Sequence, residues 1–277
     1  MAIVSILKDG EALAAAAAER VTSLIQQSIA ERGHAVVCLT GGRTPRRLYE
    51  LLADASRPWR ARIAWTRVHA FWGDERHVPP DHAESNFGMA HRALLAHVPI
   101  PGNHVHRMRG ELPSAAAAAR EYETALRQGF ELAGRTDQTF DVMLLGLGED
   151  AHIASIFPGH PLLEAGREGP PYDNEHGGRE NERVGPAFTA RQDNRVAAVW
   201  AERLDAWRIT LTPPALLDAR AILMLVSGDD KTAAVRAALD APIDEARWPA
   251  QILRAADDRV EWIMDAAAAR LRGAPPA

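Results

Sequence analysis

The sequence contains almost no cysteine and no long hydrophobic run. Cys38 is the only cysteine among 277 residues, which excludes a disulfide framework and a cysteine-based zinc site and is typical of a reducing compartment. No apolar stretch approaches the roughly 20 residues that span a bilayer. The alanine-rich stretch 12–18 has acidic residues where a leader peptide carries positive charge, so we interpret it as part of an amphipathic helix. We therefore expect a cytoplasmic protein without a membrane partner.

The sequence also has no excess of basic residues. Lys and Arg number 32 against 37 Asp and Glu, which gives a formal net charge of -5. This balance excludes a general basic field for nucleic acid, so any anion site has to be local. Hydrophobic residues make up 47% and charged residues 25% of the chain, the proportions of an ordinary globular protein. Because no internal repeat and no convincing linker occur, residues 1–277 are predicted to form a single α/β domain.

Apolar runs alternate with segments of helical periodicity along most of the chain. Helices are predicted at 11–32, 46–54, 85–96, 114–132, directly after 211, up to about 239, and at 265–271. Strands are predicted at 35–39, 67–72, 140–145, 196–200, 208–211, 221–226 and 260–263. The first helix is expected to end at Gly33, and Pro45 is expected at the first position of the second helix. This alternation favours a mostly parallel, doubly wound sheet with helices on both faces.

One segment departs from this pattern. Residues 164–195 are rich in Gly, Pro, Asn, Glu and Arg and contain few apolar residues. Such a composition buries too little apolar surface to dock firmly on the body of a protein. We expect a long, mobile surface insertion there and assign no function to it.

Four polar, glycine-bearing segments follow predicted strands, after Leu39, Trp72, Leu145 and Val226. Strands of a parallel sheet have their carboxyl ends along the same edge, so these four loops are expected to converge there. Open α/β sheets bind their ligands at this edge. The ligand site is therefore predicted at the carboxyl edge of the sheet.

The first of these loops, 40–45, has the composition of an anion site. Gly41 and Gly42 let backbone N–H groups approach an anion, and the start of the following helix adds partial positive charge. Arg43 can contribute a guanidinium and Thr44 a hydroxyl. The spacing is not that of a P-loop, and an ordinary tight strand-to-helix turn is the alternative.

The second loop, 73–76, carries three charged residues directly after a strand. Arg76 can make a bidentate contact with a phosphate or carboxylate group. Asp74 or Glu75 can hold this arginine or bind sugar hydroxyls, and a solvated charged loop is the alternative. Arg208 and Lys231 begin structural elements at the same edge and can add positive charge there, although each would be an ordinary surface cation by itself.

The third loop, 146–152, reads Gly-Leu-Gly-Glu-Asp-Ala-His. It matches the glycine spacing of a dinucleotide fingerprint, but no second strand with a ribose-binding acid follows, so we expect no nicotinamide cofactor. His152 suits general acid–base chemistry near neutrality, with Asp150 two residues away, and a structural histidine is the alternative. Ser155 lacks the flanking glycines of a nucleophile elbow and is expected to hydrogen-bond or cap. No histidine pair has metal-ligand spacing, so no metal is expected.

Taken together, these motifs resemble the glucosamine-6-phosphate deaminase/6-phosphogluconolactonase family, and within it the 6-phosphogluconolactonases. Each motif is moderately specific, and their ordered conjunction from about residue 35 to the final helix is strong. One departure is Ala151, which stands where the family usually has glycine. The matching segments are Leu-Thr-Gly-Gly-Arg-Thr-Pro at 39–45, Phe-Trp-Gly-Asp-Glu-Arg at 71–76, the loop at 146–152, Arg-Ile-Thr-Leu-Thr at 208–212, and Gly228 with Lys231.

The resemblance implies an α/β fold shared with sugar-phosphate deaminases and isomerases. It also implies hydrolysis of 6-phosphoglucono-1,5-lactone in the oxidative pentose phosphate pathway, without a metal or organic cofactor. His152 would be the catalytic base, and Asp150 would orient the histidine or bind the sugar. The partner would be a small phosphosugar lactone, bound by a monomer or a homodimer. The residues implied for the phosphosugar site are Gly41, Gly42, Thr44 and Arg76, with Arg208 and Lys231 as further members.

Two other functions remain open. A sugar-phosphate deaminase or isomerase on the same fold would need a further carboxylate close behind the histidine loop, and no acidic residue occurs between His152 and Glu164. A non-catalytic sugar-phosphate sensor would carry an N-terminal DNA-binding domain, whereas the first ligand loop here already begins at Thr40. A sensor would also have no need of the histidine loop.

Overall fold

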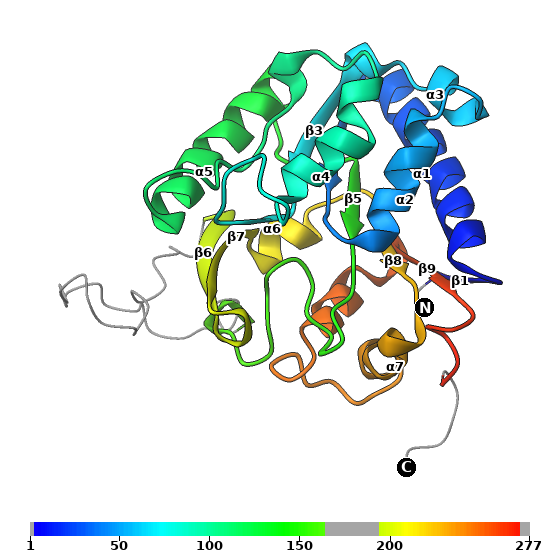
Figure 1. The fold of residues 1–277 in the computed structure, drawn as a ribbon, viewed down its shortest axis with the longest axis vertical. Helices are drawn as coiled ribbons and strands as arrows, with labels where there is room; N and C mark the ends of the chain where they lie inside the picture. The colour runs from blue at the N-terminus through cyan, green and yellow to red at the C-terminus, as the bar shows by residue number, and fades with distance from the viewer. Residues whose placement is uncertain (1–2, 164–193, 272–277) are drawn as a thin grey trace.

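The computed structural model describes residues 3–163 and 194–271, which contain a six-stranded parallel sheet (Figure 1). The order along the sheet is β1-β9-β8-β5-β2-β3, and every neighbouring pair is parallel. This architecture confirms the predicted α/β class with a mostly parallel sheet. The strands are β1 (Ile3–Leu7), β2 (Ala35–Leu39), β3 (Val68–Trp72), β5 (Val142–Leu145), β8 (Ile222–Val226) and β9 (Val260–Asp265).

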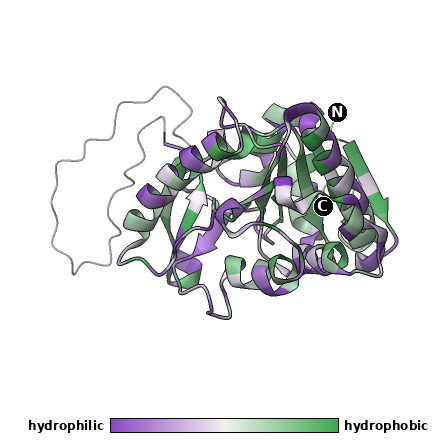
Figure 2. Ribbon diagram, turned by 90° about the horizontal axis from the view of Figure 1, so that it is seen from above, coloured by the Kyte–Doolittle hydropathy of each residue, from purple (hydrophilic) through white to green (hydrophobic). Residues whose placement is uncertain are grey.

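Helices cover both faces of this sheet, as predicted. Along β5, Val142 and Leu144 belong to one buried cluster, which includes side chains of α1, α2 and α4, whereas Met143 and Leu145 belong to a second, which includes side chains of α5, α6 and α7. In Figure 2 the strands inside the molecule are mostly hydrophobic and the helices around them carry hydrophilic stretches. The helices are α1 (Gly10–Arg32), α2 (Arg43–Ala53), α3 (Pro58–Arg62), α4 (Asn86–Ala93), α5 (Ala115–Leu132), α6 (Pro213–Leu217) and α7 (Thr232–Leu239). Short 3-10 helices are η1 (Trp65–Arg67), η2 (Leu95–His97), η3 (Gly102–His104), η4 (Pro161–Leu163), η5 (Glu202–Leu204), η6 (Asp229–Lys231) and η7 (Pro249–Arg259).

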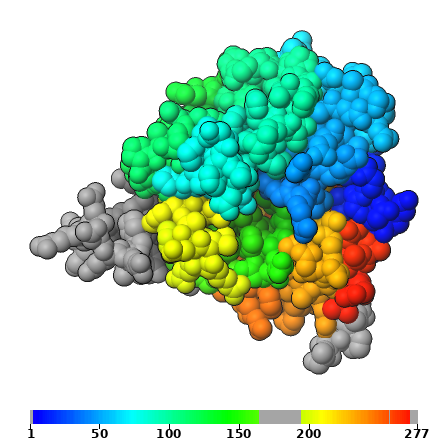
Figure 3. Space-filling model, viewed as in Figure 1, coloured from blue at the N-terminus to red at the C-terminus, as the bar shows by residue number. Residues whose placement is uncertain are grey.

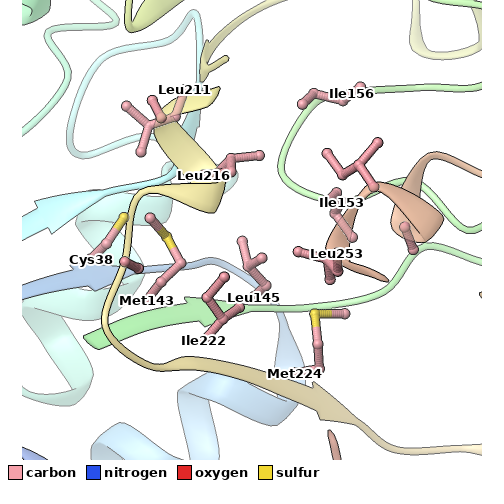
Figure 4. Close-up of a cluster of buried hydrophobic side chains, with 14 of the residues drawn as sticks. Cys38, Met143, Leu145, Ile153, Ile156, Leu211, Leu216, Ile222, Met224 and Leu253 are labelled. Carbon is pink, nitrogen blue, oxygen red and sulfur yellow. The ribbon is translucent and has the colours of Figure 1, made fainter. Parts of the chain in front are cut away.

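The second cluster anchors the loop that follows β5. Ile153 and Ile156 of this loop are fully buried and pack into the cluster with Leu145 and Leu253, and Figure 4 shows them together with the sheet residues. Burying two isoleucine side chains contributes several kcal/mol in all, at about 1.5–3 kcal/mol each. His152 lies directly before Ile153, so packing of the apolar core holds the backbone on which the histidine sits.

A small antiparallel sheet lies beside the parallel one. It has the order β4-β7-β6, with β4 (Asp74–Arg76), β6 (Val196–Ala201) and β7 (Ala206–Leu211). The predicted strands at 196–200 and 208–211 therefore belong to this sheet. The alternative of a solvated charged loop at 73–76 does not hold, because Asp74 and Glu75 are buried and their backbone groups pair with β7, as buried backbone polar groups must.

The two ends of the chain hold further differences from the sequence prediction. β1 was not expected, since five mainly apolar residues give too short a signal before the first helix. The final helix predicted at 265–271 was wrong: β9 continues to Asp265, and a turn follows in which the Asp265 side chain accepts the N–H of Ala268 at 2.8 Å. Helix α2 begins at Arg43 rather than at Pro45, whereas Gly33 ends α1 with a φ of 82° as expected.

The predicted insertion at 164–195 lies outside the described residues except for its last two positions. It therefore stays a prediction, as does the single-domain organisation. In the part of the chain that the structure describes, no helix combines the length and apolar character that crossing a membrane requires.

The amino edge of the parallel sheet is built around a buried carboxylate, Asp141. Its oxygens accept the N–H of Val36 at 2.8 Å, Nε of Arg32 at 3.0 Å and Nη2 of Arg135 at 2.5 Å. Arg220 Nε lies 3.6 Å away. Because every oxygen of this carboxylate has a donor, the group ties α1, β2 and β5 together without leaving charge unpaired.

Four histidines gather at the same edge, around the start of β3. The rings of His69 and His104 are stacked with centroids 3.9 Å apart, His69 Nδ1 lies 3.2 Å from His106 Nε2, and His34 packs edge-on against His69. Burial and the neighbouring imidazoles lower the pKa of His69 to about 3, and burial lowers that of His106 to about 4. The imidazoles of His69 and His106 are therefore neutral at physiological pH.

Candidate active site

A cleft of about 660 Å³ opens at the carboxyl edge of the parallel sheet. Figure 3 shows it as a hollow where blue, green, yellow and orange segments meet. Its walls include the segments that follow β2, β3, β5 and β8, so the predicted convergence of the four loops is correct. Every residue predicted for the site lines the cleft except Glu75, which is buried, and Asp150, which is hydrogen-bonded to the lining residue His152. A second groove, of about 400 Å³ between α2 and α4, contains none of them.

The loop between β2 and α2 forms one wall. Gly42 has a φ of 106°, and α2 starts after it with no side-chain cap and no acidic residue in its first turn. The first N–H groups of a helix have no partner within the helix. Residues 41–45 line the cleft, so this helix start supplies both unpaired donors and partial positive charge to a bound anion.

Contacts from two sides fix the shape of this loop. A Cβ at Gly41 would lie 1.9 Å from Oδ1 of Asn86, so only glycine fits there. The hydroxyl of Tyr49 accepts the N–H of Thr40 at 3.0 Å and donates to the carbonyl of Thr40 at 2.9 Å. The anion loop is thus held in place before any ligand binds.

Two arginines stand side by side on the small sheet, where Arg76 of β4 pairs in register with Arg208 of β7. Arg208 is only 6% exposed, yet its guanidinium forms no ion pair with any residue in the described ranges. Burial and the neighbouring Arg76 lower the pKa of Arg208, whereas the more distant carboxylates of Asp74, Glu84 and Glu75 act in the opposite direction. A buried charge outside any ion pair is unfavourable, so this pair of arginines favours binding of an anion.

Lys231 adds a further cation, from the segment after β8. Its Nζ lies 3.3 Å from Asp230 Oδ2 and 3.9 Å from Glu149 Oε1. Unlike Arg208, it lies at ion-pair distance from acidic side chains. Its contribution to an anion site therefore depends on how the turn before it is held.

His152 and Asp150 form a hydrogen-bonded pair at the cleft. Nδ1 of His152 lies 2.6 Å from Oδ1 of Asp150, whose other oxygen lies 3.4 Å from Arg203. The hydrogen bond from His152 lowers the pKa of Asp150 to about 2. An ionised carboxylate only accepts, so Nδ1 carries the hydrogen and Nε2 keeps a lone pair. Nε2 has no hydrogen-bond partner in the described structure, an arrangement that suits a general base.

The backbone of this loop is shaped around the imidazole. A Cβ at Gly148 would lie 2.0 Å from Nδ1 of His152, so a side chain there would displace the histidine. Ala151 has a φ of 62°, in the left-handed region that glycine adopts without strain. This conformation explains why glycine suits the position. The ring of Phe157 lies 4.6 Å from that of His152 and packs against it.

Asp74 lines the cleft and is held by uncharged donors. Its Oδ2 accepts the hydroxyl hydrogen of Ser155 at 2.7 Å, and Asn86 Nδ2 donates to its carbonyl at 2.9 Å. Ser155 is thus a hydrogen-bonding residue, as expected. Neither Asp74 nor Glu75 holds the guanidinium of Arg76. Glu75 instead accepts backbone N–H groups at the start of α4, and burial raises its pKa.

Sequence reasoning missed several residues that line the cleft. Gly10 begins α1, and Ser227 follows β8. Leu204 sits at the tip of the β6–β7 hairpin and is 54% exposed. The sequence offered no signal for Leu204, because the antiparallel pairing that brings this hairpin to the cleft was not predicted.

The chemistry available here is that of a base and an anion site. Within residues 3–163 and 194–271, no group of three or more His, Cys, Asp or Glu residues is arranged to hold a metal ion. Cys38 is buried, and burial raises the pKa of its thiol well above the usual value. It is a buried structural thiol.

Comparison with known proteins agrees with this geometry. Residues 8–262 match the family model described as glucosamine-6-phosphate isomerases/6-phosphogluconolactonase. The chain belongs to this family. A 6-phosphogluconolactonase of Synechocystis is 34% identical over 249 residues, 88% of each chain, and one of Mycobacterium tuberculosis is 37% identical over 244 residues, 85% of each chain. The structure of the Trypanosoma brucei 6-phosphogluconolactonase superposes with a TM-score of 0.74 over 99% of both chains at 26% identity.

The family match confirms the resemblance that the motifs indicated. Because the glucosamine-6-phosphate isomerase/6-phosphogluconolactonase family unites different reactions on one fold, membership alone does not fix the reaction. The side chains at the carboxyl edge decide it.

Proposed function

We propose that this protein hydrolyses 6-phosphoglucono-1,5-lactone to 6-phosphogluconate in the oxidative pentose phosphate pathway. The observation that carries the proposal is one cleft that holds both a histidine base and a buried arginine outside any ion pair. Nε2 of His152 is free of hydrogen-bond partners among the described residues, and Arg208 is buried there with no described carboxylate at ion-pair distance. A phosphorylated substrate with a hydrolysable bond fits this cleft, because its phosphate can pair with the arginine and its bond can be hydrolysed with the help of the base.

The phosphate group fits the anion site. The unpaired N–H groups at the start of α2, the Arg208 guanidinium and the Lys231 ammonium all line the cleft. Phosphate oxygens only accept hydrogen bonds, and charge-assisted bonds of this kind are among the stronger ones. Holding the phosphate away from the lactone carbonyl fixes the position of the reacting carbon.

Hydrolysis then follows from the histidine. Nε2 of His152 takes a proton from a water molecule as the water oxygen bonds to C1 of the lactone, and the carbonyl oxygen becomes an oxyanion. Arg76 is our candidate for stabilising this oxyanion. When the tetrahedral intermediate collapses, the bond from C1 to the ring oxygen breaks, and the imidazolium returns its proton to that oxygen. Asp150, with a pKa of about 2, stays ionised and stabilises the imidazolium.

The setting of the reaction belongs to the same proposal. A formal charge of -5 and a single buried cysteine support a cytoplasmic enzyme that acts on a small phosphosugar lactone without a nucleic-acid partner. We propose that it works as a monomer or a homodimer.

A coupled assay with freshly generated lactone tests the function, after spontaneous hydrolysis is subtracted. We expect kcat/KM for unphosphorylated glucono-1,5-lactone to be lower by about 100-fold or more, because several charge-assisted hydrogen bonds of about 1.5–3 kcal/mol each are lost. Equal values for both lactones would contradict the phosphate site. Release of ammonia from glucosamine 6-phosphate would instead support a deaminase, and tight binding without turnover would support a sensor.

A further inference from the structure

A buried carboxylate lies just behind the cleft, at the end of the last strand. Asp265 is 4% exposed and does not itself line the cleft. Its oxygens accept the hydroxyl hydrogen of Ser227 at 2.5 Å, the N–H of Gly228 at 3.1 Å and the N–H of Ala268 at 2.8 Å. No cationic side chain within the described ranges forms an ion pair with it, so these three donors alone compensate its burial.

Two of these donors belong to the turn that carries Lys231. Ser227, Gly228 and Lys231 all line the cleft. Gly228 has a φ of 108°, a conformation that L side chains rarely adopt, so the turn strongly favours glycine there. The N–H of Lys231 closes the turn by donating to the carbonyl of Gly228 at 3.2 Å.

The position of the Lys231 ammonium in the anion site depends on this turn. Lys231 lies within reach of two carboxylates, at 3.3 Å from Asp230 and 3.9 Å from Glu149. A turn that could move would let the ammonium pair more fully with these groups and withdraw from the cleft. The contacts to Ser227 and Gly228 from β9 oppose such a movement.

We propose that Asp265 is a positioning residue, which fixes the turn 227–231 so that Lys231 faces the anion site. On this view Asp265 sets affinity for the phosphate group and leaves the attack of water unchanged. The assignment of the anion to a substrate phosphate rests on the proposed function, but the positioning role does not depend on turnover.

The test compares Asp265→Asn with Asp141→Asn. Both positions hold buried aspartates that accept backbone N–H groups next to strands of the same sheet, but at opposite edges. In Asp265→Asn an NH2 group replaces one carboxylate oxygen, and its hydrogens face groups that can only donate hydrogen bonds to position 265. The lost hydrogen bonds should loosen the turn. We expect the Kd for inorganic phosphate, measured by calorimetry, and the KM for the phosphorylated lactone to rise about tenfold, with kcat changed less than about threefold. Asp141→Asn should lower the Tm and leave the Kd and KM unchanged.

Three results would overturn the proposal. One is a fall in kcat with unchanged phosphate affinity, another is an equal rise in Kd in both variants, and the third is no change in Kd in a folded Asp265→Asn protein. If Asp265→Asn does not fold, Ser227→Ala removes one contact to the carboxylate, and an unchanged Kd for phosphate in that variant would also reject the role. If the wild type lacks lactonase activity, the proposed function fails, whereas the phosphate titrations still decide the role of Asp265.

Discussion

The two edges of the parallel sheet carry similar charges that are used in different ways. At the amino edge, Asp141 accepts hydrogen bonds from Arg32 and Arg135 at 3.0 and 2.5 Å. At the carboxyl edge, Arg208 is also buried but forms no ion pair in the described structure, and its neighbour in register is another arginine. Arginines near a sheet edge therefore do not mark a binding site by themselves. The unpaired charge marks it, because binding an anion removes the cost of burying that charge.

The two edges also differ in how much open space their residues leave. At the carboxyl edge, glycines sit where any side chain would collide with a site residue, as at Gly41 against Asn86 and at Gly148 against His152. At the amino edge, imidazole rings stack on one another and fill the space. The carboxyl edge thus leaves space for a ligand, whereas the amino edge is filled by side chains.

The largest effect is expected from His152→Asn. Without the base, kcat should fall by about 10²–10⁴ while folding and phosphate binding stay intact. The ascending limb of the kcat pH profile should disappear, since Asp150, with a pKa of about 2, is ionised throughout the working range and cannot supply the limb. Steady-state kinetics between pH 5 and pH 9 would check both points. A near-normal kcat with an unchanged pH profile would make the histidine structural.

A smaller effect is expected from replacing one arginine at each edge, in the variants Arg208→Met and Arg135→Met. The two variants should differ in whether phosphate affinity or stability is lost. Arg208→Met should raise the Kd for inorganic phosphate about 10- to 100-fold, since one or two charge-assisted hydrogen bonds are lost. It should leave stability unchanged or slightly higher, because an unpaired buried charge is removed. Arg135→Met breaks a buried pair with Asp141 and should lower the free energy of unfolding by about 3 kcal/mol without changing the Kd.

Thermal melts with and without phosphate would measure both quantities. Phosphate should raise the Tm of the wild type and of Arg135→Met, but raise that of Arg208→Met much less. If the two variants lost phosphate affinity and stability in parallel, the contrast between paired and unpaired arginines would not hold.

The last prediction concerns acid stability at the amino edge. The pKa of His69 is lowered to about 3 in the folded protein, so the unfolded chain binds a proton that the folded one does not as the pH falls below about 6.5. Stability should therefore decrease on acidification by up to about 1.4 kcal/mol per pH unit for this group, until the pH approaches 3. Urea unfolding at pH 7, 6, 5 and 4 would give the slope, and His69→Asn should flatten it. An identical slope in the variant would show that other groups cause the acid sensitivity.

The sequence was sufficient to predict the parallel sheet and the loops at its carboxyl edge, for a physical reason. Strands buried on both faces, such as 35–39 and 222–226, read as continuous apolar runs, and glycine-bearing polar loops stand out against them. Contacts between distant segments left no such signal. The small antiparallel sheet depends on pairing of β4 with β7, more than 120 positions later in the chain, and nothing local indicates it.

The same limit applied to the site. His152 and Asp150 were predictable because they lie two positions apart in one conspicuous glycine-bearing loop. Whether Arg208 has a counterion, and that Asp265 reaches the turn at 227–228, are facts of tertiary structure. Residue type and spacing could suggest that a cation stands at this edge, but not that it stands there unpaired.

The left-handed backbone at Ala151 has a consequence for how this loop varies in evolution. An alanine at a φ of 62° costs about 1–2 kcal/mol relative to glycine. Its methyl group is fully buried in the core, which offsets about 0.8 kcal/mol of this cost. Alanine is therefore less stable than glycine at this position by about 0.2–1.2 kcal/mol. A difference of this size is small against the total stability of a domain, so glycine and alanine can interchange here without a change in the reaction.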